Sequence, residues 1–270
     1  MDERASDTYT HGHHESVLRS HRARTVANSA AYLIDRLVPG ADVLDVGCGP
    51  GTITADIAGR VAPGRVLGID ASPDAIVAAR AELDALGHTD TEVRVDDVYA
   101  LAIEDASFDV VHAHQVLQHL TDPVAALREM RRVCRPGGVV AARDGIYRAM
   151  SWFPADPLLD RWLELYCEVA EGNGGDPDAG SRLLAWARAA GCDHVETSAS
   201  AWCFATPGER AWWGGLWADR TTGSRFGEQA LERGLASQDE LVEVAAAWGR
   251  WSEHPDAWFA VLHGEIKAHV

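Results

Sequence analysis

The stretch VLDVGCGPG, Val43–Gly51, decides the fold class of this chain. Its first four residues form an apolar run interrupted by one acid, a pattern typical of a buried strand. Gly47, Gly49 and Gly51 follow at two-residue intervals, and glycine lets a backbone turn tightly and approach a ligand closely. In an open parallel sheet the first strand-to-helix turn is the usual ligand cradle. The stretch therefore predicts a strand, a ligand-binding turn and a following helix.

On both sides of this turn, apolar runs alternate with segments of helical periodicity. We predict a helix over about residues 25–37, ended by the turn at Pro39 and Gly40. The predicted strands lie at residues 41–47, 65–70, 91–95, 108–113, 137–145, 193–206 and 257–268, and the helices among the early strands at 52–62, 72–87 and 122–134. Each early strand is followed by a crossover long enough for a parallel neighbour. The pattern predicts an α/β fold with a doubly wound, mostly parallel, seven-stranded Rossmann-like sheet.

The composition excludes several classes of partner. The 270 residues hold 24 Lys and Arg against 41 Asp and Glu, a formal charge of −17, so the average surface repels a phosphate backbone and we expect no nucleic acid partner. The beginning of the sequence is polar and acidic rather than basic and apolar, and no apolar run is long enough to span a bilayer. We therefore expect a cytoplasmic protein with no membrane partner.

Cysteine and histidine usage predicts no metal site. The five cysteines are widely scattered and form no CxxC pair, which is typical of reduced thiols. His11, His13 and His14 lie close together, but no cluster of Asp, Glu or Cys accompanies them as a metal site requires. We expect these histidines to be solvated or to line a site wall.

The ligand of the glycine turn follows from three positions. A nicotinamide dinucleotide fold has G-x-G-x-x-G, whereas here Thr52 stands where the third glycine belongs. Asp70 ends the second predicted strand about twenty residues after the turn, where a carboxylate accepts hydrogen bonds from ribose hydroxyls. Asp45 beside the turn repels a pyrophosphate and attracts an ammonium or a sulfonium. S-adenosylmethionine carries a ribose, an ammonium and a sulfonium, so we expect it as cofactor; a nicotinamide-dependent oxidoreductase is a disfavoured alternative.

Four stretches carry a family resemblance: VLDVGCGPGT, VLGIDAS, RVDDVYAL and FDVVHAHQVLQHL. In this order and spacing, over roughly residues 25–145, they resemble a class I S-adenosylmethionine-dependent methyltransferase. Within that class the chain is most similar to the type-11 small-molecule branch that includes the quinone-biosynthesis C-methyltransferases. The (D/N)PPY signature of the enzymes that methylate amino groups of nucleic acid bases is absent.

The resemblance also implies the cofactor contacts. Asp45 and the loop with Gly47, Gly49 and Gly51 hold the methionine moiety, and Arg24 is the candidate partner of its carboxylate. The ribose lies at Asp70 with Ala71, the adenine edge at Asp97 with the amide of Val98, and Gln115 faces cofactor and acceptor. The alternative for Arg24 is a surface arginine without a ligand. Asp96 precedes Asp97 directly, and if Asp97 binds adenine, Asp96 is a solvated strand end or a helix cap.

Methyl transfer is an in-line displacement from an activated sulfonium, so positioning and exclusion of water supply most of the catalysis. A proton also leaves an oxygen, nitrogen or aromatic carbon acceptor, which a general base assists. The candidates are His119, His14, Tyr9 and Asp144, with water as the alternative, and His119 is preferred. A histidine that only hydrogen-bonds a helix end is an equally good reading of His119. Strand alternation predicts that His112 and His114 share one face.

All ten tryptophans lie after Met150, where we predict an added helical cap beside the sheet. Most should fill the core, and a few should form flat walls for an aromatic acceptor. We therefore expect a small aromatic acceptor and carbon methylation of an electron-rich ring such as indole, rather than O- or N-methylation, in secondary metabolism. An enzyme that binds S-adenosylmethionine but catalyses a rearrangement or decarboxylation keeps every motif and is the main alternative.

The predicted organisation is one methyltransferase domain over residues 1–270. Residues 1–40 form an N-terminal helical segment that closes the site, residues 41–148 the cofactor-binding Rossmann-like half, and residues 149–270 the remaining strands with the Trp-rich acceptor cap. The helix with Trp212, Trp213 and Trp217 is either a wall of the acceptor site or the face of a homodimer.

Overall fold

The computed structural model describes residues 15–270, with side chains from residue 19 onward, and is built on one mixed sheet. The strands occur in the spatial order β3-β2-β1-β4-β5-β8-β6, and β7 pairs with β8. The five strands from β3 to β5 are parallel, whereas β8 runs antiparallel to β5, β6 and β7. The bounds are β1 Val43–Val46, β2 Val66–Asp70, β3 Glu92–Val95, β4 Phe108–His114, β5 Cys134–Gly145, β6 Ser151–Phe153, β7 His194–Phe204 and β8 Trp258–His269.

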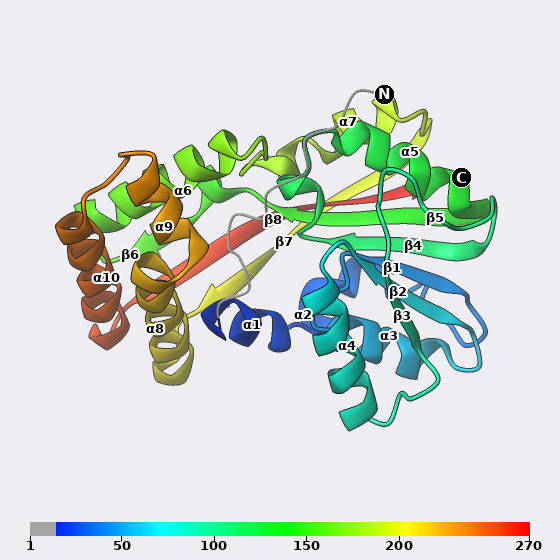
Figure 1. Ribbon diagram of the computed structural model, residues 1–270, viewed down its shortest axis with the longest axis horizontal. Coiled ribbons are helices and arrows are strands. Elements are labelled where there is room, and N and C mark those ends of the chain that lie inside the picture. The colour runs from blue at the N-terminus through cyan, green and yellow to red at the C-terminus, as the bar shows by residue number, and fades with distance from the viewer. Residues whose placement is uncertain (1–14) are drawn as a thin grey trace.

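Helices cover both faces of the sheet and gather at one end of it. In Figure 1, α3 and α4 lie on the opposite side of the sheet from α5 and α7, while α6, α8, α9 and α10 form a cap beside the ends of β6, β7 and β8. The helix bounds are α1 Glu15–Arg22, α2 Val26–Ser29, α3 Thr52–Val61, α4 Pro73–Ala85, α5 Pro123–Val133, α6 Pro157–Gly172, α7 Leu183–Ala189, α8 Pro207–Gly223, α9 Arg225–Glu232 and α10 Gln238–Glu253. Short 3₁₀ turns are η1 Ala31–Leu33, η2 Leu117–His119, η3 Tyr147–Ala149 and η4 Ala179–Ser181.

Local sequence explains where the crossover helices begin. The Ser72 hydroxyl accepts a hydrogen bond from the Ala75 amide, and Pro73 occupies the first turn of α4. Asp122 caps α5 in the same way, with Pro123 in its first turn. Because a capping side chain satisfies an orphan amide and proline is preset for the first turn, these sequences start helices directly after the strands.

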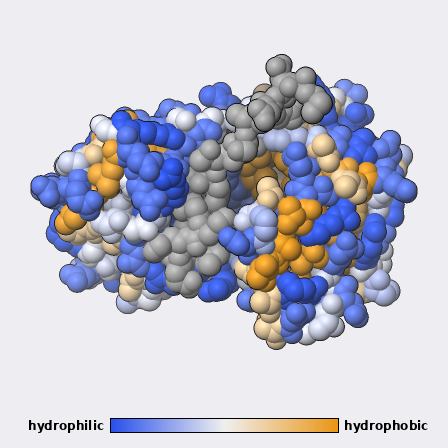
Figure 2. Space-filling view, viewed as in Figure 1, coloured by the Kyte–Doolittle hydropathy of each residue, from blue (hydrophilic) through white to orange (hydrophobic). Residues whose placement is uncertain are grey.

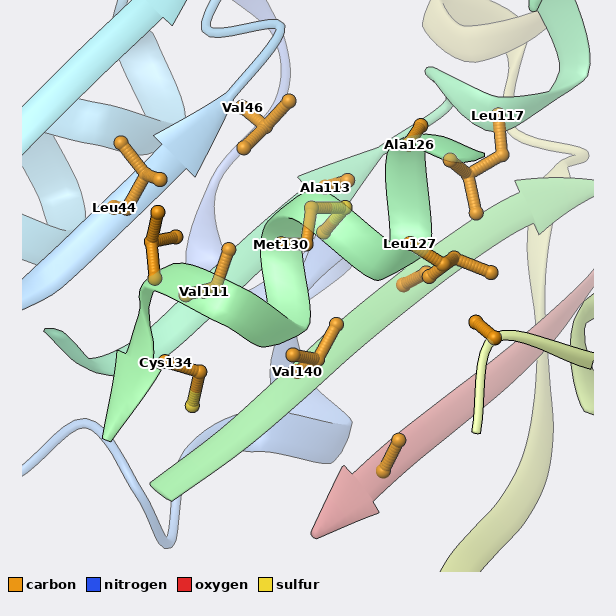
Figure 3. Close-up of a cluster of buried hydrophobic side chains, with 14 of the residues drawn as sticks. Leu44, Val46, Val111, Ala113, Leu117, Ala126, Leu127, Met130, Cys134 and Val140 are labelled. Carbon is orange, nitrogen blue, oxygen red and sulfur yellow. The ribbon is translucent and has the colours of Figure 1, made fainter. Parts of the chain in front are cut away.

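The main core lies between the sheet and α5. Figure 3 shows side chains of β1, β4 and β5 meeting Ala126, Leu127 and Met130 of α5. These helical residues are fully buried and follow helical spacing, which gives α5 one apolar face. This packing fixes the position of β4 and of the segment after it.

The cap has an aromatic core of its own. Trp162, Trp217 and Trp248 come from α6, α8 and α10, and all three are almost completely buried. The ring centroids of Trp162 and Trp217 lie 4.5 Å apart, and those of Trp162 and Trp248 lie 4.9 Å apart. Edge-to-face contacts of this kind add to the free energy gained by burying large rings. Most of the tryptophan asymmetry in the sequence therefore reflects the core of the cap.

Three expectations need correction. Over residues 15–270 the sheet has eight strands rather than seven, because the short β6, Ser151–Phe153, pairs with β8. The helix expected over residues 25–37 is interrupted at Ala30, whose φ of −139° and ψ of 22° are not helical, leaving only α2 and η1. The side chains of Trp213 and Trp217 are buried, so these two residues do not form an exposed dimer face.

The visible surface is mostly hydrophilic. Figure 2 shows hydrophobic residues on this face gathered near α4, where Val77 is 70% exposed. Within residues 15–270, no helix has the length and apolar character needed to cross a bilayer.

Candidate active site

A cavity of about 430 Å³ opens at the carboxyl ends of β1, β2 and β4 and extends to the cap. The glycine turn, Asp70, Asp97 and Gln115 line one end. The other end is aromatic, with residues that lie far from the turn in the sequence: Tyr147, Met150, Trp202, Trp213 and Trp217. The fold thus joins the expected cofactor residues and the cap in a single cavity.

The backbone of the turn requires its glycines. Gly47, Gly49 and Gly51 have φ values of 68°, 53° and 83°, in the left-handed region that favours glycine. A Cβ atom on Gly47 would lie 2.4 Å from Cγ2 of Val116, and one on Gly51 would lie 3.1 Å from Cα of Ala79. Side chains at these positions would disturb the turn and the packing of α3 on α4, so the spacing seen in the sequence has a steric cause.

Asp70 connects the glycine turn to the start of α4. Its Oδ2 accepts a hydrogen bond from the Gly49 amide at 3.0 Å, and its Oδ1 accepts one from the Ser72 amide at 2.9 Å. The carboxylate and the adjacent Ala71 both line the cavity. The position at the end of β2 is therefore the one expected for a carboxylate that binds ribose hydroxyls.

The structure separates the roles of Asp96 and Asp97. Asp96 serves the protein itself, since its carboxylate pairs with Arg94 at 3.1 Å and accepts hydrogen bonds from two backbone amides. Asp97 is exposed, accepts a hydrogen bond from the Tyr99 amide at 2.9 Å, and lines the cavity beside Val98. Both acids line the cavity, and Asp97 is the more exposed of the two.

Asp45 lies on the cavity wall but is only 3% exposed. Its Oδ2 accepts a hydrogen bond from the Thr54 hydroxyl at 2.6 Å, and its Oδ1 lies 2.8 Å from Nδ1 of His112. Asp45 of β1 pairs with His112 of β4, and strand alternation places His114 on the same face of the sheet as both. The carboxylate is thus held in place behind the glycine turn, where it contributes negative charge to this end of the cavity.

Arg24 and Gln115 form a polar bridge at the end of β4. A guanidinium nitrogen of Arg24 donates to Oε1 of Gln115 at 2.6 Å, and Nε2 of Gln115 lies 2.9 Å from Nε2 of His263. Gln115 has a φ of 54°, which is uncommon for a residue other than glycine and is found at functional sites. Both residues line the cavity.

The four expected proton acceptors occupy different places. His119 in η2 is half-buried and lines the cavity. Asp144 in β5 is completely buried, and its carboxylate lies behind η2, where Oδ1 accepts a hydrogen bond from the Gln118 amide at 3.2 Å. Among the residues that the structure describes, Asp144 does not line the cavity. His14 and Tyr9 lie outside the described residues.

Burial raises the pKa of Asp144 from 3.8 to about 7. The folded protein therefore holds this proton to higher pH than the unfolded chain does. The stability due to the protonated carboxyl is fully present below about pH 4 and is lost as the pH rises towards 7.

An Asp144→Asn variant should lack this pH dependence. Between pH 5 and pH 7 the natural protein should lose stability relative to the variant by on the order of 1 kcal/mol per pH unit. Urea unfolding at both pH values measures the difference, with the exposed Asp193→Asn variant as control. Parallel pH curves for the natural protein and Asp144→Asn would contradict the raised pKa.

Sequence reasoning missed several residues of the aromatic end. Arg220 on α8 is 4% exposed, its Nη2 donates to the Ser20 hydroxyl at 2.5 Å, and its guanidinium lies 5.0 Å from the ring centroid of Trp217. Gln118 is also part of the cavity wall. Arg220 lies in no sequence motif, and Gln118 lies within FDVVHAHQVLQHL, but the place of each in the site depends on contacts between distant segments.

Comparisons with known proteins identify the family. Residues 37–191, more than half of the chain, match the family described as Methyltransferase domain. An uncharacterized methyltransferase of Schizosaccharomyces pombe is 32% identical over 269 residues, which cover 96% of this chain and 95% of the relative. The 2-methyl-6-phytyl-1,4-hydroquinone methyltransferase of Synechocystis is 35% identical over 156 residues, covering 52% of this chain and 48% of that protein.

A solved structure supports the fold. The phosphoethanolamine N-methyltransferase 2 of Haemonchus contortus, determined with S-adenosylhomocysteine, has a TM-score of 0.55 at 17% identity and covers 88% of this chain and 52% of that chain. The Rossmann-like fold class and the resemblance seen in the sequence are confirmed, and S-adenosylmethionine is the cofactor. The chain belongs to the methyltransferase-domain family and is an S-adenosylmethionine-dependent methyltransferase.

Proposed function

We propose that this enzyme methylates a carbon atom of a small, electron-rich aromatic acceptor, such as an indole, a phenol or a quinone precursor. The observation that carries the proposal is the continuous cavity that leads from the glycine turn to a wall of tryptophans. Flat apolar walls suit an aromatic ring, and aromatic side chains stabilise positive charge that develops on it. The name of the Synechocystis relative, a hydroquinone methyltransferase, agrees with a ring of this kind.

The residues of the turn fit the cofactor. Gly47 and Gly51 let the turn pack closely against Val116 and α4, and Gly49 leaves the backbone open to close approach. The carboxylates of Asp45, Asp70 and Asp97 place negative charge at this end of the cavity. In the proposal, Asp70 and Ala71 hold the ribose. The remaining cofactor contacts are the methionine moiety at Asp45 and the turn with Gly49, the adenine at Asp97 and Val98, and the methionine carboxylate at Arg24 beside Gln115. When bound, S-adenosylmethionine supplies a methyl group on an already activated sulfonium.

His119 is the proposed contact of the acceptor, because it lines the cavity whereas Asp144 lies behind it. His14 and Tyr9 remain candidates to close the site from the N-terminal segment. We further propose that the single methyltransferase domain is divided into residues 1–40, 41–148 and 149–270. We also propose that the enzyme is cytoplasmic and acts in secondary metabolism. A homodimer remains a proposal, with a face other than the buried rings of Trp213 and Trp217.

The test is an incubation with S-adenosylmethionine carrying an isotopically labelled methyl group and a panel of indoles, phenols and quinone precursors. We expect labelled product and S-adenosylhomocysteine in equal amounts, with the label on a ring carbon. Label on oxygen or nitrogen would contradict carbon methylation. Conversion of an acceptor without S-adenosylhomocysteine would instead support the alternative of rearrangement or decarboxylation.

Substitutions of two tryptophans test whether the acceptor binds at the aromatic end of the cavity. Trp202 lines the cavity, whereas Trp186 packs against the main core away from it. Trp202→Leu should raise the KM for the acceptor about fivefold, the effect of losing an aromatic contact worth about 1 kcal/mol, and should change cofactor affinity less. Trp186→Leu should change neither constant. Equal effects of the two substitutions on KM would place the acceptor elsewhere.

A further inference from the structure

Gln118 is a buried residue of η2 that makes hydrogen bonds with the end of β5 and with the segment before η4. It is 4% exposed, and its backbone amide donates to Oδ1 of Asp144 at 3.2 Å. Its backbone carbonyl accepts a hydrogen bond from the Asp176 amide at 3.0 Å. Its side-chain Oε1 accepts one from the Gly145 amide at 3.3 Å. These contacts fix both the place and the orientation of the side-chain amide.

This orientation determines which atom faces His119. The side chain of Gln118 has one oxygen, which only accepts, and one nitrogen, which only donates. Because Oε1 is directed at the Gly145 amide, Nε2 is the atom that lies 3.1 Å from Nε2 of His119. The histidine atom in this contact must accept the hydrogen bond.

The contact therefore sets the tautomer of His119. A neutral imidazole carries one proton, and the nitrogen that accepts a hydrogen bond cannot be the one that holds it. With Nε2 accepting from Gln118, the proton of the neutral ring lies on Nδ1. In this state Nδ1 of His119, a residue that lines the cavity, is an N–H donor and has no lone pair.

We propose that His119 binds the methyl acceptor as an Nδ1–H donor to an oxygen atom, and is not the general base, while Gln118 is the positioning residue that selects this tautomer. The inference rests on the proposed function, because it takes the cavity as the acceptor site. It narrows the acceptor to aromatic rings with a hydroxyl, phenolate or carbonyl oxygen. A donor to such an oxygen stabilises negative charge there and favours the phenolate, whose ring carbons are stronger nucleophiles. The hydroxyl proton, and the proton that the methylated ring carbon then loses, go to water.

The tautomer can be measured without knowledge of the acceptor. Nuclear magnetic resonance of the whole protein, labelled with ¹⁵N-histidine and saturated with S-adenosylhomocysteine, distinguishes protonated from unprotonated ring nitrogens. The signals of His119 are those lost in His119→Asn. We expect the proton on Nδ1 near neutral pH. A proton on Nε2, or on both nitrogens, would overturn the inference.

Turnover of the acceptor found in the methylation assay supplies the second test. In His119→Asn the side-chain nitrogen occupies about the place of Nδ1 and still donates, whereas His119→Ala has no donor. We expect turnover by the alanine variant to fall about a hundredfold, as for loss of a donor to a developing anion, and turnover by the asparagine variant to stay within about tenfold of the natural enzyme. Equal losses in the two variants would contradict a donor role.

In a Gln118→Glu variant, the pH dependence of turnover should have opposite signs if His119 acts as a donor and if it acts as a base. A carboxylate accepts from Nε2 of His119, so the neutral ring then has a lone pair on Nδ1. For a donor, turnover should fall as the pH rises and the ring becomes neutral; for a base it should rise. Unchanged binding of S-adenosylhomocysteine verifies that the variant is folded, and the asparagine variant tests the same point if it is not.

The outcomes separate this inference from the proposed function. If no aromatic acceptor is methylated, the proposed function fails, while the resonance measurement still decides the tautomer. If ring methylation occurs and the proton lies on Nε2, the proposed function stands and only the role of His119 is wrong. Turnover of an aromatic ring without any oxygen substituent, at the same rate as its hydroxylated analogue, would also contradict the donor role.

Discussion

An Asp70→Ala variant is expected to bind S-adenosylmethionine and S-adenosylhomocysteine at least about a hundredfold more weakly than the natural protein. A hydrogen bond to a charged group contributes about 1.5–3 kcal/mol, and the carboxylate is proposed to accept one from each of two ribose hydroxyls. Asp70 also accepts hydrogen bonds from the amides of Gly49 and Ser72, so its loss frees the glycine turn as well.

Calorimetric titration with S-adenosylmethionine, S-adenosylhomocysteine and NADH measures this effect. The control is Asp74→Ala, which removes an exposed carboxylate four residues further along the chain, in the first turn of α4. Unchanged affinity in the Asp70 variant would mean that the ribose lies elsewhere. Binding of NADH by the natural protein would contradict the interpretation of the GxGxG spacing.

A Trp162→Ala variant is expected to lose about 3–5 kcal/mol of unfolding free energy, the usual cost of removing a buried tryptophan. The side chain is completely buried and its ring contacts those of Trp217, Trp248 and Phe259 from three other elements. Removal leaves a cavity at the centre of the cap, which its neighbours fill only in part because rigid aromatic rings surround it.

Urea unfolding followed by circular dichroism checks this prediction. Trp258→Ala is the matched control, because Trp258 is 39% exposed and should cost less than half as much. Equal losses in the two variants would contradict the central place of Trp162. Trp162 does not line the described cavity, so a folded variant should still bind S-adenosylhomocysteine at low temperature.

The cofactor end of the site was accessible from sequence because its determinants are local. The turn from Gly47 to Gly51 needs positive φ angles, and Asp70 ends a short apolar strand, so residue type and spacing define both positions. The alternation of strands and helices defined the parallel half of the sheet for the same reason. β6 was missed because three residues before a proline carry no periodicity.

The acceptor end depends on contacts between distant segments, which spacing does not encode. The glycine-rich segment Glu171–Ser181 has the composition of a mobile linker, yet the Asp176 amide in it donates to the Gln118 carbonyl, and the Tyr147 amide donates to the carbonyl of Pro177. The contact of Gln118 with Gly145 likewise joins η2 to the end of β5. His119 was identified from the sequence, whereas the orientation of its neighbour Gln118, which depends on these contacts, could not be predicted.

The position of β8 has a consequence for biosynthesis. This strand follows all others along the chain, yet it pairs with β5, β6 and β7 and is the only link between β7 and the rest of the sheet in the described residues. While the ribosome is still making α10, the edges of β5 and β7 have no partner, and unpaired edges invite aggregation. Translation that stalls before Trp258 thus yields a polypeptide with two exposed strand edges, on which aggregation can begin.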